Sequence, residues 1–500
     1  MRLARASEEL AATAKRSAKA AVLAAVLRDA APEEVPVVVG VLTGAPRQGR
    51  IGIGWRTLRS VDVAPADEPT LDVLDVDRAI DRLAAMSGAG VQGARRQVLG
   101  EVFGAATQTE QELLWKVFSG ELRQGALDGV MVDAIAKGAG VPIASVRRAH
   151  MLSGDLGAAA GAAFAGGAVA LAGVGMEPGR AVQPMLAAPA ADVASAMAAS
   201  GPSSVEWKLD GARIQAHRRN GDVRLFTRNL NDVTGRLGAV VELVAALAGG
   251  DLVLDGEVLG VDDEGAPRRF QDTMGDFGAD GPTGRGRSLS AYFFDVLHAG
   301  GGPVVDEPLF VRREILESVV PAANRLASLV TADSDTASAF LDDALDAGHE
   351  GVVVKALDAP YDAGRRGGAW RKVKPVHTLD LVVIAVEWGH GRRHGWLSNL
   401  HLGARRDDGA FVMVGKTFKG LTDELLTWQT EALRALAIGE SGHVVHVRPE
   451  LVVEIALDGV QASTRYPGGV ALRFARVRRY RPDKSPADAD PIEAVQAMLR

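Results

Sequence analysis

The stretch Glu206-Trp207-Lys208-Leu209-Asp210-Gly211-Ala212-Arg213 opens a part of the chain in which apolar and polar residues alternate. The alternation runs from Ile214 to Leu225 and is interrupted at Asn220-Gly221, a dipeptide typical of a type I′ turn. This pattern predicts a β-hairpin, because successive side chains of a strand point to opposite faces. Lys208 is therefore expected between the end of a preceding strand and the hairpin.

Downstream of the hairpin, short apolar runs predict four more strands: Leu252 to Leu259, Ala291 to Leu297, Gly351 to Lys355 and Ala369 to Val373. A helix is predicted over Ser338 to Ala347, with Gly348 at its end. From Asp380 onward, short strands recur between glycine-rich turns, as is typical of a small β-barrel. These strands are Leu381 to Trp388, Phe411 to Val414, His443 to Val447 and Leu451 to Ala456.

The chain upstream of about Arg180 has a different period. Apolar residues recur there at spacings of three and four, which predicts helices. The clearest runs are Glu101 to Phe118, Met131 to Lys137 and Ala144 to Leu152. From Glu177 to Ser204 the sequence is rich in proline, alanine and serine, which is typical of a surface connector. We therefore expect a multidomain protein with an all-α domain over residues 1–180, an α+β domain over 181–375 and a β-barrel over 376–500.

The composition excludes several classes of protein. With 500 residues, 47% apolar and 24% charged, the chain is long enough for several packed cores, so collagen, coiled coil and global disorder are excluded. It has no cysteine, which excludes disulfides, thiolate metal sites and a cysteine nucleophile. The net charge is −7, so any face that binds nucleic acid must come from a local basic cluster. Such a cluster runs from Arg465 to Lys484, where Asp483 is the only acidic residue.

One stretch raises the question of a membrane. Residues Leu156 to Met176 have no charge and reach about the 20 residues that span a bilayer. They are mostly alanine and glycine, which contribute little transfer free energy, so a close-packed helix followed by a glycine-rich turn is expected instead. Charged residues near the amino terminus interrupt any signal-peptide core. We expect a cytoplasmic protein that does not bind a membrane.

Lysine is scarce, since only 11 of the 56 basic residues are lysines. A lysine is more informative in such an arginine-rich chain, because an amine can become a nucleophile and a guanidinium cannot. Five lysines lie in strand-like or compact basic segments of the last 300 residues: Lys208, Lys355, Lys372, Lys374 and Lys484.

The pattern Lys208-x-Asp210-Gly211-x-Arg213 resembles the first motif of the covalent nucleotidyltransferases, which include DNA ligases, RNA ligases and messenger-RNA capping enzymes. Six further patterns resemble that superfamily's motifs and follow in the same order. They are Thr227-Arg228-Asn229, Leu254-Asp255-Gly256-Glu257-Val258, Tyr292-Phe293-Phe294-Asp295, Glu350-Gly351-Val352-Val353-Val354-Lys355, Trp370-Arg371-Lys372-Val373-Lys374, and Arg473-Phe474-Ala475-Arg476 through Asp483-Lys484. The last is typical of DNA ligases, although Ala475 stands where ligases often have proline.

The amino-terminal region shows a weaker resemblance. Arg47-Gln48-Gly49-Arg50-Ile51-Gly52 and Gly120-Glu121-Leu122-Arg123-Gln124-Gly125-Ala126-Leu127 are similar to the helical DNA-binding domain of bacterial and archaeal ATP-dependent DNA ligases. Together the patterns imply a bacterial ATP-dependent DNA ligase. Its three domains would be a helical DNA-binding domain, a nucleotidyltransferase (adenylation) domain and an OB-fold.

The resemblance also implies roles for individual residues. Lys208 would attack the α-phosphorus of ATP, form a lysyl-AMP bond and expel pyrophosphate. Only a neutral amine can attack, and nearby cations favour the neutral form because they lower the pKa of a lysine. The implied contacts to ATP are Glu206, Arg213, Arg228, Glu257, Phe294, Lys355, Lys372, Lys374 and Arg473. Glu257 and Glu350 would hold Mg²⁺ (or Mn²⁺), which prefers carboxylate oxygens and phosphates. The implied nucleic-acid contacts are Arg213, Arg228, Arg476, Arg479 and Lys484.

Spacing, the resemblance and the steps of the reaction add further expectations. Asp255 and Glu257 lie two apart on a predicted strand, so both should face the nucleotide, and Lys372 and Lys374 share a face for the same reason. Phe294 would stack on adenine, although packing in the core is the common role of such a residue. A hinge is expected near Asp380, because the C-terminal domain must move between steps.

The expected partner is nicked duplex DNA, bound by a monomer, and the sequence does not reveal clamp or repair partners. An RNA ligase, a capping enzyme or a catalytically silent scaffold that binds DNA ends remains an alternative. An NAD-dependent ligase is disfavoured because those enzymes usually have a four-cysteine zinc module.

Overall fold

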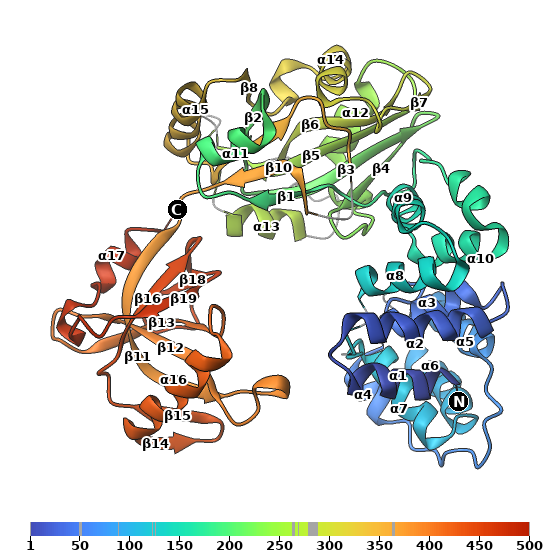
Figure 1. Ribbon diagram of the computed structural model, residues 1–500, viewed down its shortest axis with the longest axis horizontal. Coiled ribbons are helices and arrows are strands. Elements are labelled where there is room, and N and C mark those ends of the chain that lie inside the picture. The colour runs from blue at the N-terminus through green and yellow to red at the C-terminus, as the bar shows by residue number, and fades with distance from the viewer. Residues whose placement is uncertain are drawn as a thin grey trace.

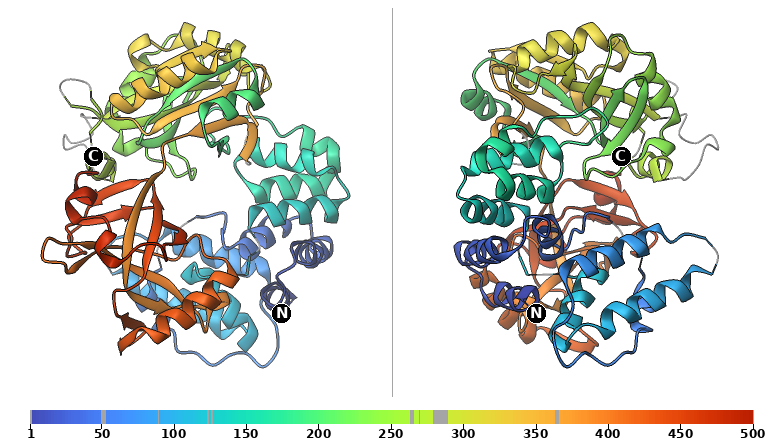
Figure 2. Two further views of the ribbon diagram at one scale, coloured as in Figure 1. Left: turned by 60° about the vertical axis from the view of Figure 1, so that its left-hand side comes forward. Right: turned by 90° about the vertical axis from the view of Figure 1, so that its right-hand side faces the viewer.

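The computed structural model describes residues 2–49, 53–88, 90–122, 124–125, 127–262, 266–268, 270–278, 289–362 and 366–499. Three regions follow one another along the chain: a helical region, a central region with two β-sheets, and a β-rich C-terminal region. Figures 1 and 2 show that the helical and C-terminal regions lie on the same side of the central region.

The described part of the helical region contains ten helices. They are α1 (Arg2–Ala12), α2 (Arg16–Asp29), α3 (Val35–Thr43), α4 (Trp55–Arg59), α5 (Val73–Ala85), α6 (Val91–Gly104), α7 (Gln108–Ser119), α8 (Asp128–Ala139), α9 (Ile143–Ser153) and α10 (Leu156–Ala172). The run predicted as helical over Glu101 to Phe118 is divided between α6 and α7. Thr107 and Glu110 form a capping box at the start of α7, which satisfies backbone N–H groups at that helix end.

Helix α10 covers most of the uncharged stretch that raised the question of a membrane. Its Ala159, Ala160 and Ala163 are buried, and the backbone departs from helical geometry at Gly166 and Gly167. This confirms the prediction of a close-packed helix. None of the helices in the described ranges is long and apolar enough to cross a membrane.

The predicted surface connector over Glu177 to Ser204 is partly wrong, because two regular elements lie within it. Strand β1 (Leu186–Pro189) pairs in parallel with β10 (Arg366–Val373), and α11 (Val193–Ser200) follows it. A proline fits there because β1 is at the edge of its sheet.

The central region is built on two five-stranded sheets. One has the order β1-β10-β9-β2-β8, in which β2 is Ser203–Lys208, β8 is Ser328–Thr331 and β9 is Gly351–Ala356. The other has the order β4-β3-β5-β6-β7, with β3 (Ala212–Arg219), β4 (Asp222–Thr227), β5 (Leu252–Gly260), β6 (Leu289–Ala299) and β7 (Gly302–Pro303). The predicted hairpin is confirmed as β3 and β4, and Asn220 and Gly221 have the positive φ values of 50° and 88° that a type I′ turn requires.

Helices flank the two sheets (Figure 1). They are α12 (Gly238–Ala246), α13 (Phe270–Gly278), α14 (Leu309–Val319) and α15 (Ser334–Asp346). The predicted helix over Ser338 to Ala347 corresponds to α15, which begins one turn earlier because Asp333 caps it.

The C-terminal region contains a seven-stranded sheet with an apolar core on one face. Its strands are β11 (His377–Trp388), β12 (Leu397–Arg405), β13 (Phe411–Thr417), β14 (Ala437–Ser441), β15 (Val444–Val447), β16 (Val452–Leu457) and β19 (Arg476–Tyr480). Strands β17 (Gly459–Ala462) and β18 (Val470–Arg473) form a separate pair, and helices α16 (Asp423–Ala435) and α17 (Ile492–Gln496) complete the region.

Asp380, near which a hinge is expected, itself lies inside β11. It pairs with Glu454 of β16, and its carboxylate accepts hydrogen bonds from Arg481 and Lys484. The short connection between β10 and β11, residues 374–376, is the place where the two regions are joined.

Candidate active site

One cleft of about 790 Å³ gathers most of the site residues inferred from the sequence. Its walls come from both central sheets and from the C-terminal region. Twelve of the fourteen predicted residues line it: Glu206, Lys208, Arg213, Arg228, Glu257, Phe294, Glu350, Lys355, Lys372, Lys374, Arg473 and Arg476. The other two lie elsewhere, where Arg479 contacts Glu454 and Lys484 contacts Asp380.

Two glycines allow the strands beside Lys208 to approach closely. A Cβ on Gly211 would lie 2.4 Å from the carbonyl oxygen of Val258, and one on Gly351 would lie 2.3 Å from that of Val373. Gly351 also has a φ of 142°, which L side chains rarely adopt. Gly211 thus lets the residues after Lys208 lie against β5, and Gly351 lets β9 lie against the end of β10. Separately, the backbone N–H of Glu350 donates to the carbonyl of Lys208 at 3.0 Å, which places the two residues side by side.

The side chains of Lys208 and Glu350 form an ion pair inside the cleft, and both are largely buried. Glu257 lies close to the same amine. Burial raises the pKa of Glu257 to about 7, although the positive charges of Lys208 and Arg213 oppose the shift. A further cation beside Glu257 would therefore stabilise its ionised form.

A second ion pair lies among aromatic rings. The Nζ of Lys355 is 2.5 Å from Glu206 Oε2, and both side chains are 2% exposed. The same Nζ lies 4.4 Å from the ring centroid of Phe294 and 4.1 Å from that of Trp370. Phe293, on the other face of the strand, is completely buried, whereas Phe294 lines the cleft. The structure thus separates an aromatic residue of the core from one that a ligand can reach.

Asp255 does not have the position expected from its spacing. It is fully buried, is not among the described residues that line the cleft, and forms two hydrogen bonds of 3.0 and 2.6 Å with the Arg213 guanidinium. Tyr361 donates to the same carboxylate at 2.7 Å. Burial lowers the pKa of Arg213, but the charge of Asp255 outweighs it and raises this pKa overall. Asp255 therefore fixes Arg213 in the wall of the cleft.

Two ion pairs join the central and C-terminal regions, and the cation comes from the C-terminal region in one and from the central region in the other. Arg473 of the C-terminal region contacts Asp210 at 2.7 Å, and Lys374 of the central region contacts Asp458 at 2.5 Å. Asp458 also accepts from Arg476 at 3.1 Å. Each region thus offers the other one cation and one carboxylate at the mouth of the cleft.

Several cleft residues were missed by the sequence analysis. They are the carboxylate Asp458, the aromatic residues Trp370 and Phe474, and the cation Lys419. Trp370 stands two positions from Lys372 on a strand, so the shared face was a usable signal. Asp458 follows a predicted strand and has no neighbouring pattern that would have singled it out.

The amino-terminal patterns lie only partly within the described residues. Arg50, Ile51, Gly52, Arg123 and Ala126 fall outside them. Arg47 and Gln48 hydrogen-bond to carboxylates of α5, in which Asp77 accepts from both. These two residues therefore fix the loop after α3 against α5.

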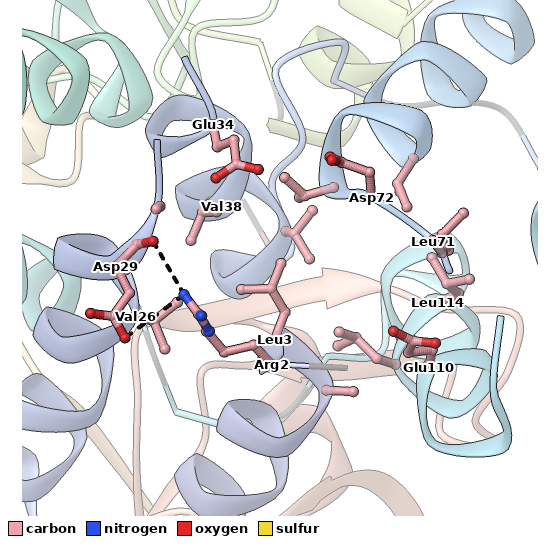
Figure 3. Close-up of a pocket in the computed structure, with 16 residues that line it drawn as sticks. Arg2, Leu3, Val26, Asp29, Glu34, Val38, Leu71, Asp72, Glu110 and Leu114 are labelled. Atoms are coloured by element: carbon pink, nitrogen blue, oxygen red, sulfur yellow. Dashed lines mark hydrogen bonds and ion pairs between the residues drawn. The ribbon is translucent and has the colours of Figure 1, made fainter. Parts of the chain in front are cut away.

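A second cavity, of about 450 Å³, lies in the helical region (Figure 3). Four carboxylates and one cation line it, namely Asp29, Glu34, Asp72, Glu110 and Arg2. The Arg2 guanidinium is itself directed to Asp29. A wall of this charge would repel phosphates, so this cavity suits an anionic ligand less well than the larger cleft does.

Three family models match the chain. They are "DNA ligase N terminus" over residues 59–136, "ATP dependent DNA ligase domain" over 184–374 and "ATP dependent DNA ligase C terminal region" over 393–484. A "Probable DNA ligase" of Saccharopolyspora erythraea is 55% identical, over 98% of this chain and 96% of that protein. Another, of Rhodococcus jostii, is 54% identical over 99% of this chain and 98% of that protein.

A solved structure named "Pmar-Lig_Pre." has the same fold, with a TM-score of 0.62 and 19% identity over 96% of this chain and 99% of that chain. The chain is thus a multidomain protein with a helical N-terminal region, a nucleotidyltransferase domain and an OB-like C-terminal domain. The matches span almost its full length, and the chain belongs to the family of ATP-dependent DNA ligases.

Proposed function

We propose that this enzyme seals nicks in duplex DNA through a lysyl-AMP intermediate at Lys208. The observation that supports it best is the convergence in one cleft of a lysine, two carboxylates, an aromatic face and a group of cations. AMP would pass from ATP to Lys208 and then to the 5′-phosphate of the nick. The 3′-hydroxyl would displace it in the last step.

The first step uses the neutral amine of Lys208. Its Nζ attacks the α-phosphorus, a P–N bond forms, and the bond to the bridging oxygen breaks to release pyrophosphate. The amine must lose a proton before this attack. Glu350 contacts the Nζ and is therefore the nearest acceptor for the proton.

The base is assigned to the end of the cleft that holds Glu206, Lys355 and Phe294. An ionised carboxylate only accepts hydrogen bonds and an ammonium only donates them. The edge of adenine offers an amino donor beside a ring-nitrogen acceptor, so it matches Glu206 and Lys355. Phe294 would stack on the purine, which contributes about 1–3 kcal/mol.

The phosphates are assigned to other cations that line the cleft. Lys372 of β10 and Lys374, the residue after the end of that strand, both line the cleft and would meet the α-phosphate, while Arg473 would orient the leaving pyrophosphate. Arg213 and Arg228 would contact the ribose or the phosphates, and Arg228 is the more exposed of the two. Phosphoryl transfer depends mainly on such positioning and charge neutralisation.

A divalent cation fits beside Glu257 and Glu350. The pKa of the half-buried Glu257 is raised by burial even beside Lys208 and Arg213, and both Glu257 and Glu350 line the cleft near Lys208. In the described part of the chain, no group of three or more acidic or histidine side chains could hold a metal alone. This suits Mg²⁺ or Mn²⁺, which can take phosphate oxygens and water as its other ligands. When bound, the metal would neutralise charge on the phosphates.

The domain boundaries are also part of the proposal. Residues 1–180 would form an all-α DNA-binding domain, 181–375 the adenylation domain and 376–500 an OB-fold barrel. Arg213, Arg228, Arg476, Arg479 and Lys484 would contact DNA, mainly through its phosphates, and the protein would act as a monomer. Binding should therefore weaken strongly as salt increases.

The test uses purified protein, Mg²⁺ and ATP labelled at the α-phosphorus. Wild type should acquire covalent label, Lys208→Ala should acquire none, and the matched control Lys416→Ala should label normally because Lys416 pairs with Glu387 outside the cleft. Label on Lys208→Ala would refute the nucleophile, and label only from NAD would refute the cofactor. Sealing of nicked RNA but not of nicked DNA would favour the RNA-ligase alternative.

A further inference from the structure

Behind Glu206, three polar side chains form a short chain of hydrogen bonds. Arg313 of α14 donates from Nη1 to Ser204 Oγ at 2.8 Å and from Nη2 to Ser328 Oγ at 3.1 Å. Ser204 Oγ lies 3.1 Å from Glu206 Oε1, and Arg313 Nη1 lies 3.7 Å from the same oxygen. Ser204 is buried, and the Arg313 side chain is only 18% exposed.

The chemistry of these groups fixes which group donates and which accepts in each hydrogen bond. A guanidinium can only donate, so Ser204 Oγ accepts from Arg313. The single hydroxyl hydrogen of Ser204 is then directed to Glu206 Oε1. The other carboxylate oxygen, Oε2, is paired with Lys355 at 2.5 Å. Glu206 is thus held through a hydrogen bond at Oε1 and an ion pair at Oε2.

Arg313 and Ser204 act from behind the wall of the cleft. Neither is among the described residues that line it, whereas Glu206 is. Any effect they have on a bound nucleotide must therefore pass through the position and charge of Glu206.

We propose that Arg313 and Ser204 are positioning residues that set the purine selectivity of the enzyme by locking Glu206 as an acceptor. This inference rests on the proposed function, which places the base beside Glu206. A 6-amino purine donates to the carboxylate, whereas a 6-keto purine presents an oxygen that the carboxylate repels. If the Glu206 carboxylate is held in one place, the difference in binding between the two purines is large. If the carboxylate can rotate away from the base, that difference is small.

The test compares ATP with ITP, which differ in the amino or keto group at C6 of the base. The rate of covalent labelling is measured against nucleotide concentration for wild type, Ser204→Ala, Arg313→Met and Arg313→Lys. We expect the ATP:ITP ratio of kcat/KM to fall about tenfold in Ser204→Ala and Arg313→Met, mainly through KM, because a hydrogen bond to a charged group is lost. Arg313→Lys, which keeps the charge, should recover part of the selectivity.

Arg325→Met is the matched control. Arg325 approaches Glu317, as Arg313 does, but in the described structure it makes no contact with Ser204 or Glu206. It should keep the wild-type ratio. An unchanged ratio in both Ser204→Ala and Arg313→Met, with or without a lower melting temperature, would overturn the proposal. Failure of the proposed function would be distinct, because wild type would then form no adduct with either nucleotide.

Discussion

Replacing Asp458 with asparagine should make the enzyme bind ATP more tightly. Asp458 neutralises Lys374 across the boundary between the two regions and also contacts Arg476. Both cations line the cleft where the triphosphate is assigned. The carboxylate therefore competes with phosphate for the same donors, and a neutral amide competes far less.

The size of the effect follows from these contacts. A hydrogen bond to a charged group contributes about 1.5–3 kcal/mol. Lys374 is 20% exposed and Arg476 is 40% exposed, so solvent screening moves the effect to the lower end of that range. A gain of about 1.4 kcal/mol corresponds to a tenfold lower ATP concentration for half-maximal lysyl-AMP formation.

The assay is the rate of covalent labelling in a single turnover, measured over a range of ATP concentrations. Asp483→Asn serves as the control, because Asp483 lies in the same region and pairs with Arg481 outside the cleft. If Asp458→Asn required more ATP than wild type, Asp458 would be orienting the two cations and the idea of competition would be refuted.

Asp255→Asn should lower the free energy of unfolding by about 3–5 kcal/mol in a urea titration, because it leaves the buried Arg213 guanidinium without its charged partner; a loss below 1 kcal/mol would contradict this. Gly351→Ala should cost about 1–3 kcal/mol, because its Cβ would meet the carbonyl of Val373, and thermal unfolding would show it. Burial, with smaller effects of His298 and Arg224, lowers the pKa of His217 to about 3, so the folded protein binds fewer protons than the unfolded chain. This histidine should therefore leave the free energy of unfolding independent of pH above about pH 6.5 and lower it by up to about 1.4 kcal/mol per pH unit below that value. His217→Gln should make the free energy of unfolding less dependent on pH, and an unchanged slope would refute the assignment.

The elements that position the site were accessible from sequence because their signals are local. The alternation from Ile214 to Leu225 with its Asn220-Gly221 turn is a property of adjacent residues, and it predicted β3 and β4 correctly. The spacing of Lys372 and Lys374 likewise predicted that both point to one side; both line the cleft, although β10 ends at Val373 and Lys374 lies just beyond it.

Features that depend on distant parts of the chain could not be read in this way. Strand β1 has only four residues, and its parallel partner β10 lies about 180 positions away, so the segment was expected to be an irregular connector. Asp255 shares a strand with Glu257, yet pairing with Arg213 removes it from the cleft. Asp458 lines the cleft but was missed because its partner Lys374 belongs to another region of the chain.

The connection of residues 374–376 limits how the C-terminal domain can travel. Three residues, fully extended, reach only about 10 Å, so this tether permits rotation about a pivot rather than free diffusion. Its first residue is Lys374, which also holds Asp458. Swinging the domain away would separate Asp458 from Lys374 beside the pivot, so the charge that this lysine presents to the cleft depends on the orientation of the domain.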